Sequence, residues 1–156
     1  MVIQRWQSLL LLVAGNLMAV FTFCSLGQFQ TPDYTLDFTT LGLKIEGIST
    51  DGAQSGYVLC TWYFFALSLI STIIPLIAIF CFKNLRLQKR LCLCEVLFIV
   101  TAAVTGGLLG YTSVEGVAPS WSTVIICPLL TLVATLMAYN RICSDDRKLR
   151  SAYRLR

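Results

Sequence analysis

The chain has 156 residues, of which 56% are hydrophobic and only 13% are charged, and its mean hydropathy is +0.75. A soluble domain carries charge on about a quarter of its residues, because water must solvate its surface. The composition therefore excludes an ordinary soluble domain and predicts one membrane domain over residues 1–156. Histidine is absent, so the chain lacks the commonest general base and the commonest metal ligand.

Four apolar stretches are long enough to cross a bilayer as helices. They cover about residues 4–26, 57–82, 91–111 and 121–140. A helix needs about 20 residues to cross the hydrocarbon core. Aromatic residues that favour the lipid interface stand near several of the ends, such as Trp6, Tyr111 and Trp121. We therefore predict an all-α membrane protein, a bundle of four transmembrane helices.

The first stretch has an alternative interpretation. A single Arg5 before an apolar run also fits a secretory signal peptide, with Ser25-Leu26-Gly27 as a weak small-x-small cleavage site. The bulky residues near that site, Phe23 among them, disfavour cleavage. We favour a retained span and keep a cleaved signal as the alternative.

The connection over residues 27–56 is the only sizeable aqueous segment. Residues 34–39 alternate in polarity with aromatic and β-branched side chains, and Leu41 to Ile45 resume after a short break. This pattern predicts a small β-hairpin, which should rest on the outer ends of the helices because two strands alone are marginal in water. The second outer connection, residues 112–120, is expected to be a tight loop.

Small residues at a spacing of four predict a face for close helix packing. They are Ala102, Gly106 and Gly110 in the third stretch and Gly15 and Ala19 in the first. Ala103 and Gly107 form a second stripe beside them. Packing within the chain is favoured, because four short helices must first pack against one another, and a dimer face is the alternative.

Glu95 is the sole acidic side chain within a predicted span. With the span beginning near residue 91, it lies one turn from the inner end, within reach of Arg5 or Arg141. A structural ion pair is favoured there, and a proton relay is the alternative. Pro75 and Pro128 each remove a helical hydrogen bond and predict kinks, which we attribute to shape rather than mechanism.

Seven cysteines are spread along the chain. Cys24 and Cys60 fall near the outer boundary, where a disulfide between the first two spans is one option and free thiols are the other. Four more lie near the inner boundary, namely Cys81, Cys92, Cys94 and Cys143. Their spacing matches no recognised zinc motif, so we expect neither a metal nor a cofactor.

The basic residues are strongly asymmetric. Every Lys and Arg except Lys44 lies at the start of the first stretch, between the second and third, or after the fourth. By the positive-inside rule this side is cytoplasmic, so both termini are predicted to be inside.

The basic tail over residues 141–156 is predicted to contain a separate short helix, capped by Ser144 with Asp145 and Asp146 in its first turn. Its bases include Arg147, Lys148, Arg150, Arg154 and Arg156. Such a helix could lie on an anionic leaflet or dock a partner, and a plain topology anchor is an equal alternative.

Both ends of the chain resemble a bacterial family. The opening Ile3-Gln4-Arg5 and the closing Arg150-Ser151-Ala152-Tyr153-Arg154-Leu155-Arg156 are similar to those of small membrane proteins catalogued as a domain of unknown function. Tyr153 stands where family members usually carry an acid, so no salt bridge is expected from that position. The resemblance covers the whole chain and implies a four-helix protein of the bacterial inner membrane, without catalytic residues.

These observations favour a non-enzymatic assembly or scaffold component over a small transporter or lipid-handling protein. A membrane thiol redox protein built on Cys24 and Cys60 is a third class. We expect the lipid bilayer as the main partner, other membrane proteins or a second copy of the chain as further candidates, and no nucleic acid.

Overall fold

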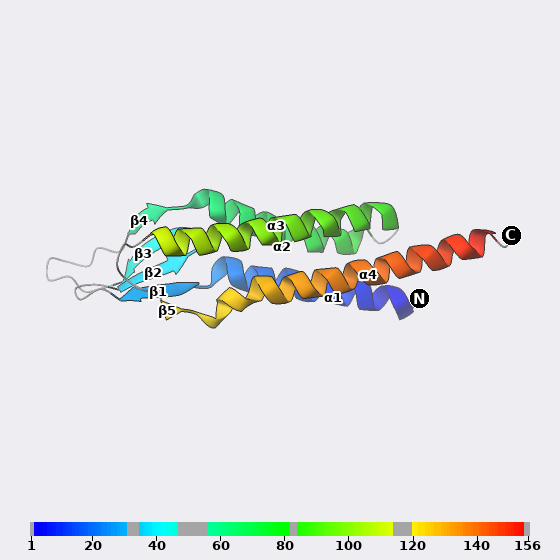
Figure 1. Ribbon diagram of the computed structural model, residues 1–156, viewed down its shortest axis with the longest axis horizontal. Coiled ribbons are helices and arrows are strands. Elements are labelled where there is room, and N and C mark those ends of the chain that lie inside the picture. Colours follow the sequence, from blue (N-terminus) through cyan, green and yellow to red (C-terminus); the bar gives the residue numbers. More distant parts are fainter. Residues whose placement is uncertain (1, 31–34, 47–55, 82–83, 114–119, 155–156) are drawn as a thin grey trace.

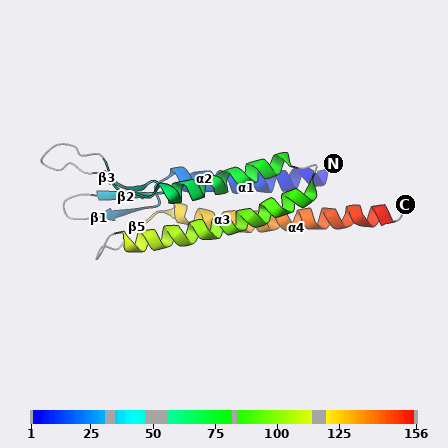
Figure 2. The ribbon, with the colours of Figure 1, turned by 90° about the horizontal axis from the view of Figure 1, so that it is seen from above.

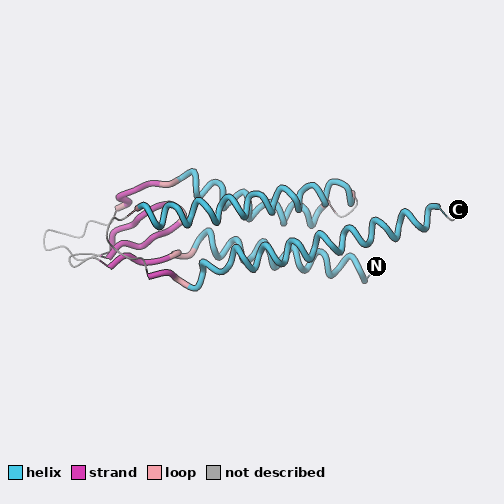
Figure 3. Tube along the Cα trace, in the orientation of Figure 1, coloured by secondary structure: helices cyan, strands magenta, loops and turns pink. Residues whose placement is uncertain are grey.

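The computed structural model describes residues 2–30, 35–46, 56–81, 84–113 and 120–154. Four long helices make up most of it: α1 (Val2–Phe23), α2 (Trp62–Phe80), α3 (Leu85–Thr112) and α4 (Cys127–Arg154). A 3-10 helix, η1 (Thr123–Ile126), precedes α4. The strands are β1 (Gly27–Gln30), β2 (Thr35–Thr39), β3 (Gly42–Glu46), β4 (Tyr57–Cys60) and β5 (Ser120–Trp121). Figures 1 and 3 show the strands gathered at one end of the helices, the sheet end, and both chain ends at the other, the terminal end.

The four long helices lie side by side, as the two perpendicular views agree (Figures 1 and 2). Each packs against two others in the ring α1–α2–α3–α4, so α1 also contacts α4. All four are long and apolar enough to cross a membrane. The prediction of a mainly helical chain with four such helices is therefore confirmed.

The polarity of these helices is reversed relative to a soluble protein. Large apolar side chains lie on the outside, such as Trp62 (69% exposed), Leu97 (67%) and Phe80 (81%). Buried polar side chains come from all four helices and include Gln7, Thr22, Ser68, Ser71, Thr72, Gln88, Glu95, Thr131 and Thr135. An apolar surface around a partly polar interior suits a lipid environment and indicates a multi-pass membrane protein.

The helices at the terminal end extend beyond their apolar stretches. α3 begins at Leu85, where the Asn84 side chain accepts a hydrogen bond from the Leu87 amide, so the bases near residues 86–90 lie on a helix rather than in a loop. α4 continues without a break to Arg154. The prediction of a separate tail helix capped by Ser144 is therefore wrong, because the buried face of α4 continues through Ala138 and Ile142.

Two acids of α4 hold this extension to the neighbouring helices. The Gln7 side chain of α1 donates a hydrogen bond to Asp145, and Lys89 Nζ of α3 lies 2.6 Å from Asp146 Oδ2. The residues predicted to start a new helix instead join three existing ones.

We expect Asp146→Asn to lower the free energy of unfolding by about 0.5–1 kcal/mol, the range for a pair that remains partly in water. Thermal unfolding in detergent would measure it. A double-mutant cycle with Lys89→Met isolates the pair from other contacts of Asp146. A coupling energy of zero would contradict a stabilising ion pair.

The strands form one antiparallel sheet in the order β4-β3-β2-β1-β5. The predicted pairing of two strands near residues 34–45 corresponds to β2 and β3. The predicted hairpin is nevertheless only part of the sheet, because β1 and β4 extend it and β5 joins from the second connection. The tight loop expected over residues 112–120 is corrected at Ser120, which pairs with Gln28, while residues 114–119 lie outside the described part. The fold is therefore mostly helical with a small sheet, rather than all-α.

An aromatic core joins the sheet to the helices. Leu36 and Phe38 of β2 point inward, and Phe38 meets Phe29 edge to face. Next to them, Phe21 of α1 and Phe64 of α2 form a second such pair with ring centroids 6.1 Å apart. Each such pair adds about 0.5–1.5 kcal/mol beyond its area burial. The sheet therefore shares its core with the helices.

Candidate functional site

The predicted small-residue face is filled by aromatic rings. Ala102, Gly106 and Gly110 are buried on one side of α3. A Cβ atom added at Gly106 would lie 2.9 Å from Phe64 Cζ, and one at Gly110 would lie 2.9 Å from Trp121 Cζ3. Within this chain the face therefore packs against side chains of α2 and β5, which supports the intrachain interpretation.

The two small residues of α1 lie in a different contact. Gly15 is buried against Pro75 and Leu76 of α2, where an added Cβ atom would be 3.5 and 3.4 Å from the nearest side-chain atoms. Ala19 is half-buried. The structure therefore places Gly15 at the α1–α2 contact and the glycines of α3 elsewhere.

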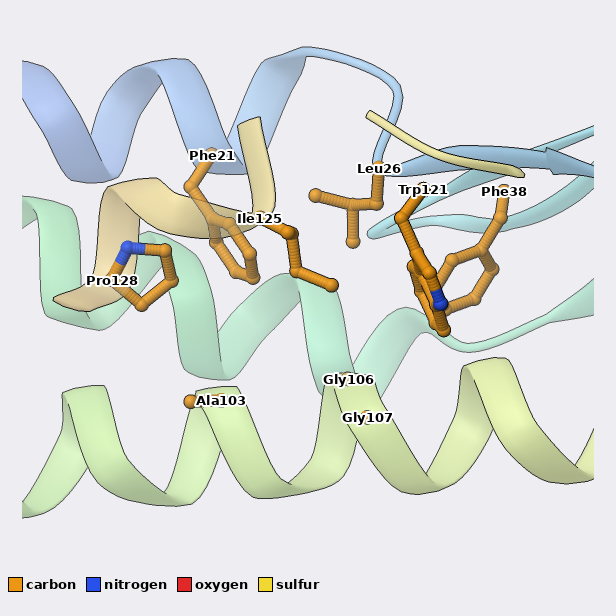
Figure 4. Close-up of a pocket in the computed structure, with 9 residues that line it drawn as sticks. All are labelled: Phe21, Leu26, Phe38, Ala103, Gly106, Gly107, Trp121, Ile125 and Pro128. Carbon is orange, nitrogen blue, oxygen red and sulfur yellow. The ribbon is translucent and has the colours of Figure 1, made fainter. Parts of the chain in front are cut away.

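The second small-residue stripe is open. Ala103 and Gly107 are exposed on α3, and a Cβ atom added at Gly107 would meet nothing within 4 Å. Both border an apolar pocket of about 330 Å³, where Figure 4 shows them across from Ile125 and Pro128. All the residues that line this hollow are apolar or glycine.

A second hollow of about 550 Å³ shares three wall residues with the first, namely Ala103, Ile125 and Pro128. It adds Ile99, Val100, Val104, Leu129 and Leu132 from α3 and α4. The two hollows form one apolar depression, called here the α3–α4 groove.

Pro128 contributes to the groove rather than to a kink. It is the second residue of α4, directly after η1. In the first turn of a helix the backbone amides make no intrahelical hydrogen bond, so proline removes none there. The kink predicted at Pro128 therefore does not arise.

Glu95 is buried between the helices. It follows the start of α3 by ten residues, about 15 Å along the axis. Its side chain is fully buried, whereas Arg141 is exposed. The favoured ion pair with Arg141 is therefore not formed, and the side chain of Arg5, the other base named, lies outside the described part.

Glu95 instead bonds to α4. Thr135 Oγ1 lies 3.0 Å from Glu95 Oε1 and also 2.9 Å from the Thr131 carbonyl oxygen. The other carboxyl oxygen, Oε2, has no hydrogen-bond partner among the described residues. Leaving a buried polar group unsatisfied costs about 1–3 kcal/mol, more if charged, so this carboxyl is the most unusual polar group of the helical interior.

Of the two options for Cys24 and Cys60, the structure shows free thiols rather than a disulfide. Cys24 follows α1 and Cys60 ends β4, and both are exposed free thiols. Because the disulfide is absent between these two described residues, the redox interpretation has no support from the structure. Among the described residues, His, Cys, Asp and Glu side chains form no group of three that could hold a metal ion.

The basic tail residues lie on the last turns of α4. Arg147 and Lys148 are exposed. Arg150 and Arg154 belong to the same helix, and Arg156 lies outside the described residues. The bases therefore extend along one rigid helix past the end of α1, as Figure 1 shows.

Sequence reasoning missed the buried polar residues around Glu95, including its partner Thr135. Gln88 and Glu95 are seven residues apart on α3, and Thr131 and Thr135 are four apart on α4, spacings that keep each pair on one helix face. Polar residues at helical spacing inside apolar spans were the available signal.

Comparisons with known proteins add the family. No curated protein matches the chain. The family described as Domain of unknown function (DUF4293) matches residues 3–155, nearly the whole length. This confirms the resemblance inferred from the two ends, and the chain belongs to the DUF4293 family of proteins of unknown function.

Proposed function

We propose that this protein is a non-enzymatic component of membrane assemblies, and that its α3–α4 groove receives a transmembrane helix of a partner protein. One observation carries the proposal: the groove is apolar, and small residues of α3 form part of its floor. Since lipid chains are as apolar as leucine, helices in membranes associate mainly where small residues allow close packing.

The open stripe distinguishes a helix from a lipid chain as the occupant. Ala103 and Gly107 lie four residues apart, so they expose the α3 backbone along one line. A flexible acyl chain would fill any apolar hollow and needs no such line. A partner helix gains from it, because a close backbone approach increases the van der Waals contact.

Site-specific photocrosslinking in native membranes tests this proposal. A photoreactive residue at Val104, which lines the groove, should yield a crosslink to a membrane-spanning peptide of another protein, and one at Leu97 outside the groove should not. Gly107→Leu should abolish the Val104 crosslink by filling the groove. Thr101→Leu, on an exposed part of α3 outside the groove walls, is the control. Crosslinks to lipid alone would favour lipid handling instead.

A small transporter is the second candidate, favoured by one observation. Glu95 is a fully buried carboxyl within a helix long enough to span the membrane, and intramembrane acids commonly mark ion or proton pathways. Flux of Na⁺ or protons in vesicles containing the purified protein, lost in Glu95→Gln, would favour transport over assembly.

We further propose that the protein resides in a bacterial inner membrane with both termini in the cytoplasm. The asymmetry of the Lys and Arg residues supports this orientation. Alkaline phosphatase fused after Arg156 should be inactive, because that enzyme requires the oxidising periplasm, whereas a fusion of green fluorescent protein should fluoresce. An active phosphatase fusion would reverse the orientation.

A further inference from the structure

One hydrogen bond fixes how α2 and α3 face each other. Gln88 Nε2 of α3 donates to the Ala78 carbonyl oxygen of α2 at 3.3 Å. The helices run in opposite directions, and seven residues make about two turns. Two turns along both helices therefore bring Glu95 opposite Ser71.

A second contact along the same face supports this register. Two further turns bring Ala102 of α3 to the height of Phe64 of α2. The Phe64 ring indeed covers Gly106, one turn beyond Ala102. Ser71 and Glu95 thus lie between two contacts that the structure shows directly.

Ser71 and Glu95 are both fully buried, and both carry an unsatisfied oxygen. Neither Ser71 Oγ nor Glu95 Oε2 has a hydrogen-bond partner within the described residues. The register inferred from the Gln88–Ala78 hydrogen bond places them opposite each other across the α2–α3 contact, and neither bonds to the other. Two such atoms at one height in the helical interior suit the binding of a third polar species between them.

The polar atoms around this place are oxygens, which are the preferred ligands of hard cations. Thr135 Oγ1 lies 3.0 Å from the Glu95 carboxyl. Pro75 lies one turn after Ser71 and has no amide hydrogen to donate to the Ser71 carbonyl. The Ser71 carbonyl oxygen is therefore a further possible cation ligand at the same height. Carbonyls released from helical bonding bind cations in other membrane proteins in this way.

No basic side chain neutralises the carboxyl among the described residues. Lys89, on the same helix, pairs with Asp146. The titratable groups on the same side of α3 and α4 are the Cys92 and Cys143 thiols and the Tyr139 hydroxyl, none of them cationic. Since an unpaired charge in the membrane interior is costly, the carboxyl requires either a bound proton or a cation from the aqueous phase.

We propose that Glu95, Ser71 and Thr135 form a binding site for one monovalent cation, Na⁺ or a proton, in the interior of the helical part. The site is separate from the α3–α4 groove, so a test of one proposal does not decide the other. Buried hydroxyls continue from its height toward the sheet: Thr72 Oγ1 lies 3.2 Å from Thr22 Oγ1, and Thr40 donates to the Thr22 carbonyl.

Binding of radioactive Na⁺ to the purified protein, with choline chloride holding the ionic strength constant, tests the site. We expect saturable binding whose affinity falls at least tenfold in both Glu95→Gln and Ser71→Ala. Ser68→Ala should bind like the wild type, because the Ser68 hydroxyl already donates to the Phe65 carbonyl one turn from the site. Circular dichroism checks that each variant is folded, and Ser71→Ala keeps the test valid if Glu95→Gln does not fold.

Infrared spectroscopy at neutral pH tests whether the site holds a proton instead of Na⁺. If a proton occupies the site, it resides on the Glu95 carboxyl, Na⁺ will not bind, and a protonated carboxyl band should be present that Glu95→Gln removes and Ser71→Ala shifts. Absence of both Na⁺ binding and this band would overturn the proposal. A carboxyl band that Ser71→Ala leaves unchanged would also overturn it, since Glu95 would then be only a buried neutral acid.

Discussion

Replacing Gly42 with alanine is expected to lower the free energy of unfolding by about 3 kcal/mol, through a strained backbone and a clash. Gly42 has φ = +138°, a conformation that residues with a side chain rarely adopt. An added Cβ atom would also lie 2.9 Å from the Leu59 carbonyl carbon on the paired strand β4. Because backbone occupies the space, β3 and β4 would have to separate.

Thermal unfolding in detergent measures this effect, with Gly56→Ala as the matched control. Gly56 is exposed, and an added Cβ atom there meets nothing within 4 Å. The control should unfold at or slightly above the wild-type temperature, because alanine restricts the unfolded chain more than glycine does. Equal melting temperatures for the two variants would show that the β3–β4 contact does not stabilise the fold.

Hydropathy located the four helices but not where they end. The apolar run near residues 57–82 contains both β4 and α2, because Tyr57 to Cys60 are as apolar as the helix that follows. The change from strand to helix occurs at Thr61, whose hydroxyl donates to the Thr40 carbonyl in another part of the chain. Such a contact between distant segments is invisible to a local pattern.

The same limitation explains the error at Glu95. The bases over residues 86–90 suggested a loop, so the helix was predicted to begin near residue 91. Charges mark where the hydrocarbon ends, whereas a helix can continue into water, as α3 does from Leu85. The earlier helix start leaves the distance of Glu95 from these charges unchanged, so the error concerned the side chain, which is fully buried and bonds to Thr135 of α4.

The spacing of small residues predicted a packing face on α3 but not what would fill it. Trp121, which was expected at the interface, covers Gly110 from strand β5. The α3–α4 groove could not be predicted either, because part of its wall comes from η1, a turn with no distinctive sequence pattern. Side chains on a helix face are readable from sequence, but their partners depend on the packing of whole elements.

Gly106→Leu should destabilise the protein by about 2 kcal/mol, the middle of the range for overpacking a core. The added side chain would meet the fully buried Phe64, whose ring has Phe21 against its edge and therefore little freedom to withdraw. Unfolding in detergent, followed by near-ultraviolet circular dichroism of the aromatic side chains, measures the loss.

Gly107→Leu separates this clash from the general effect of removing a glycine from a helix. Both positions are interior to α3, so leucine should improve helix propensity by up to about 1 kcal/mol at each. At Gly107 nothing opposes that gain, because the added side chain extends into the open α3–α4 groove. Destabilisation of both variants to the same extent would mean that the groove is closed in the folded protein, and the surface proposed for a partner helix would then not exist.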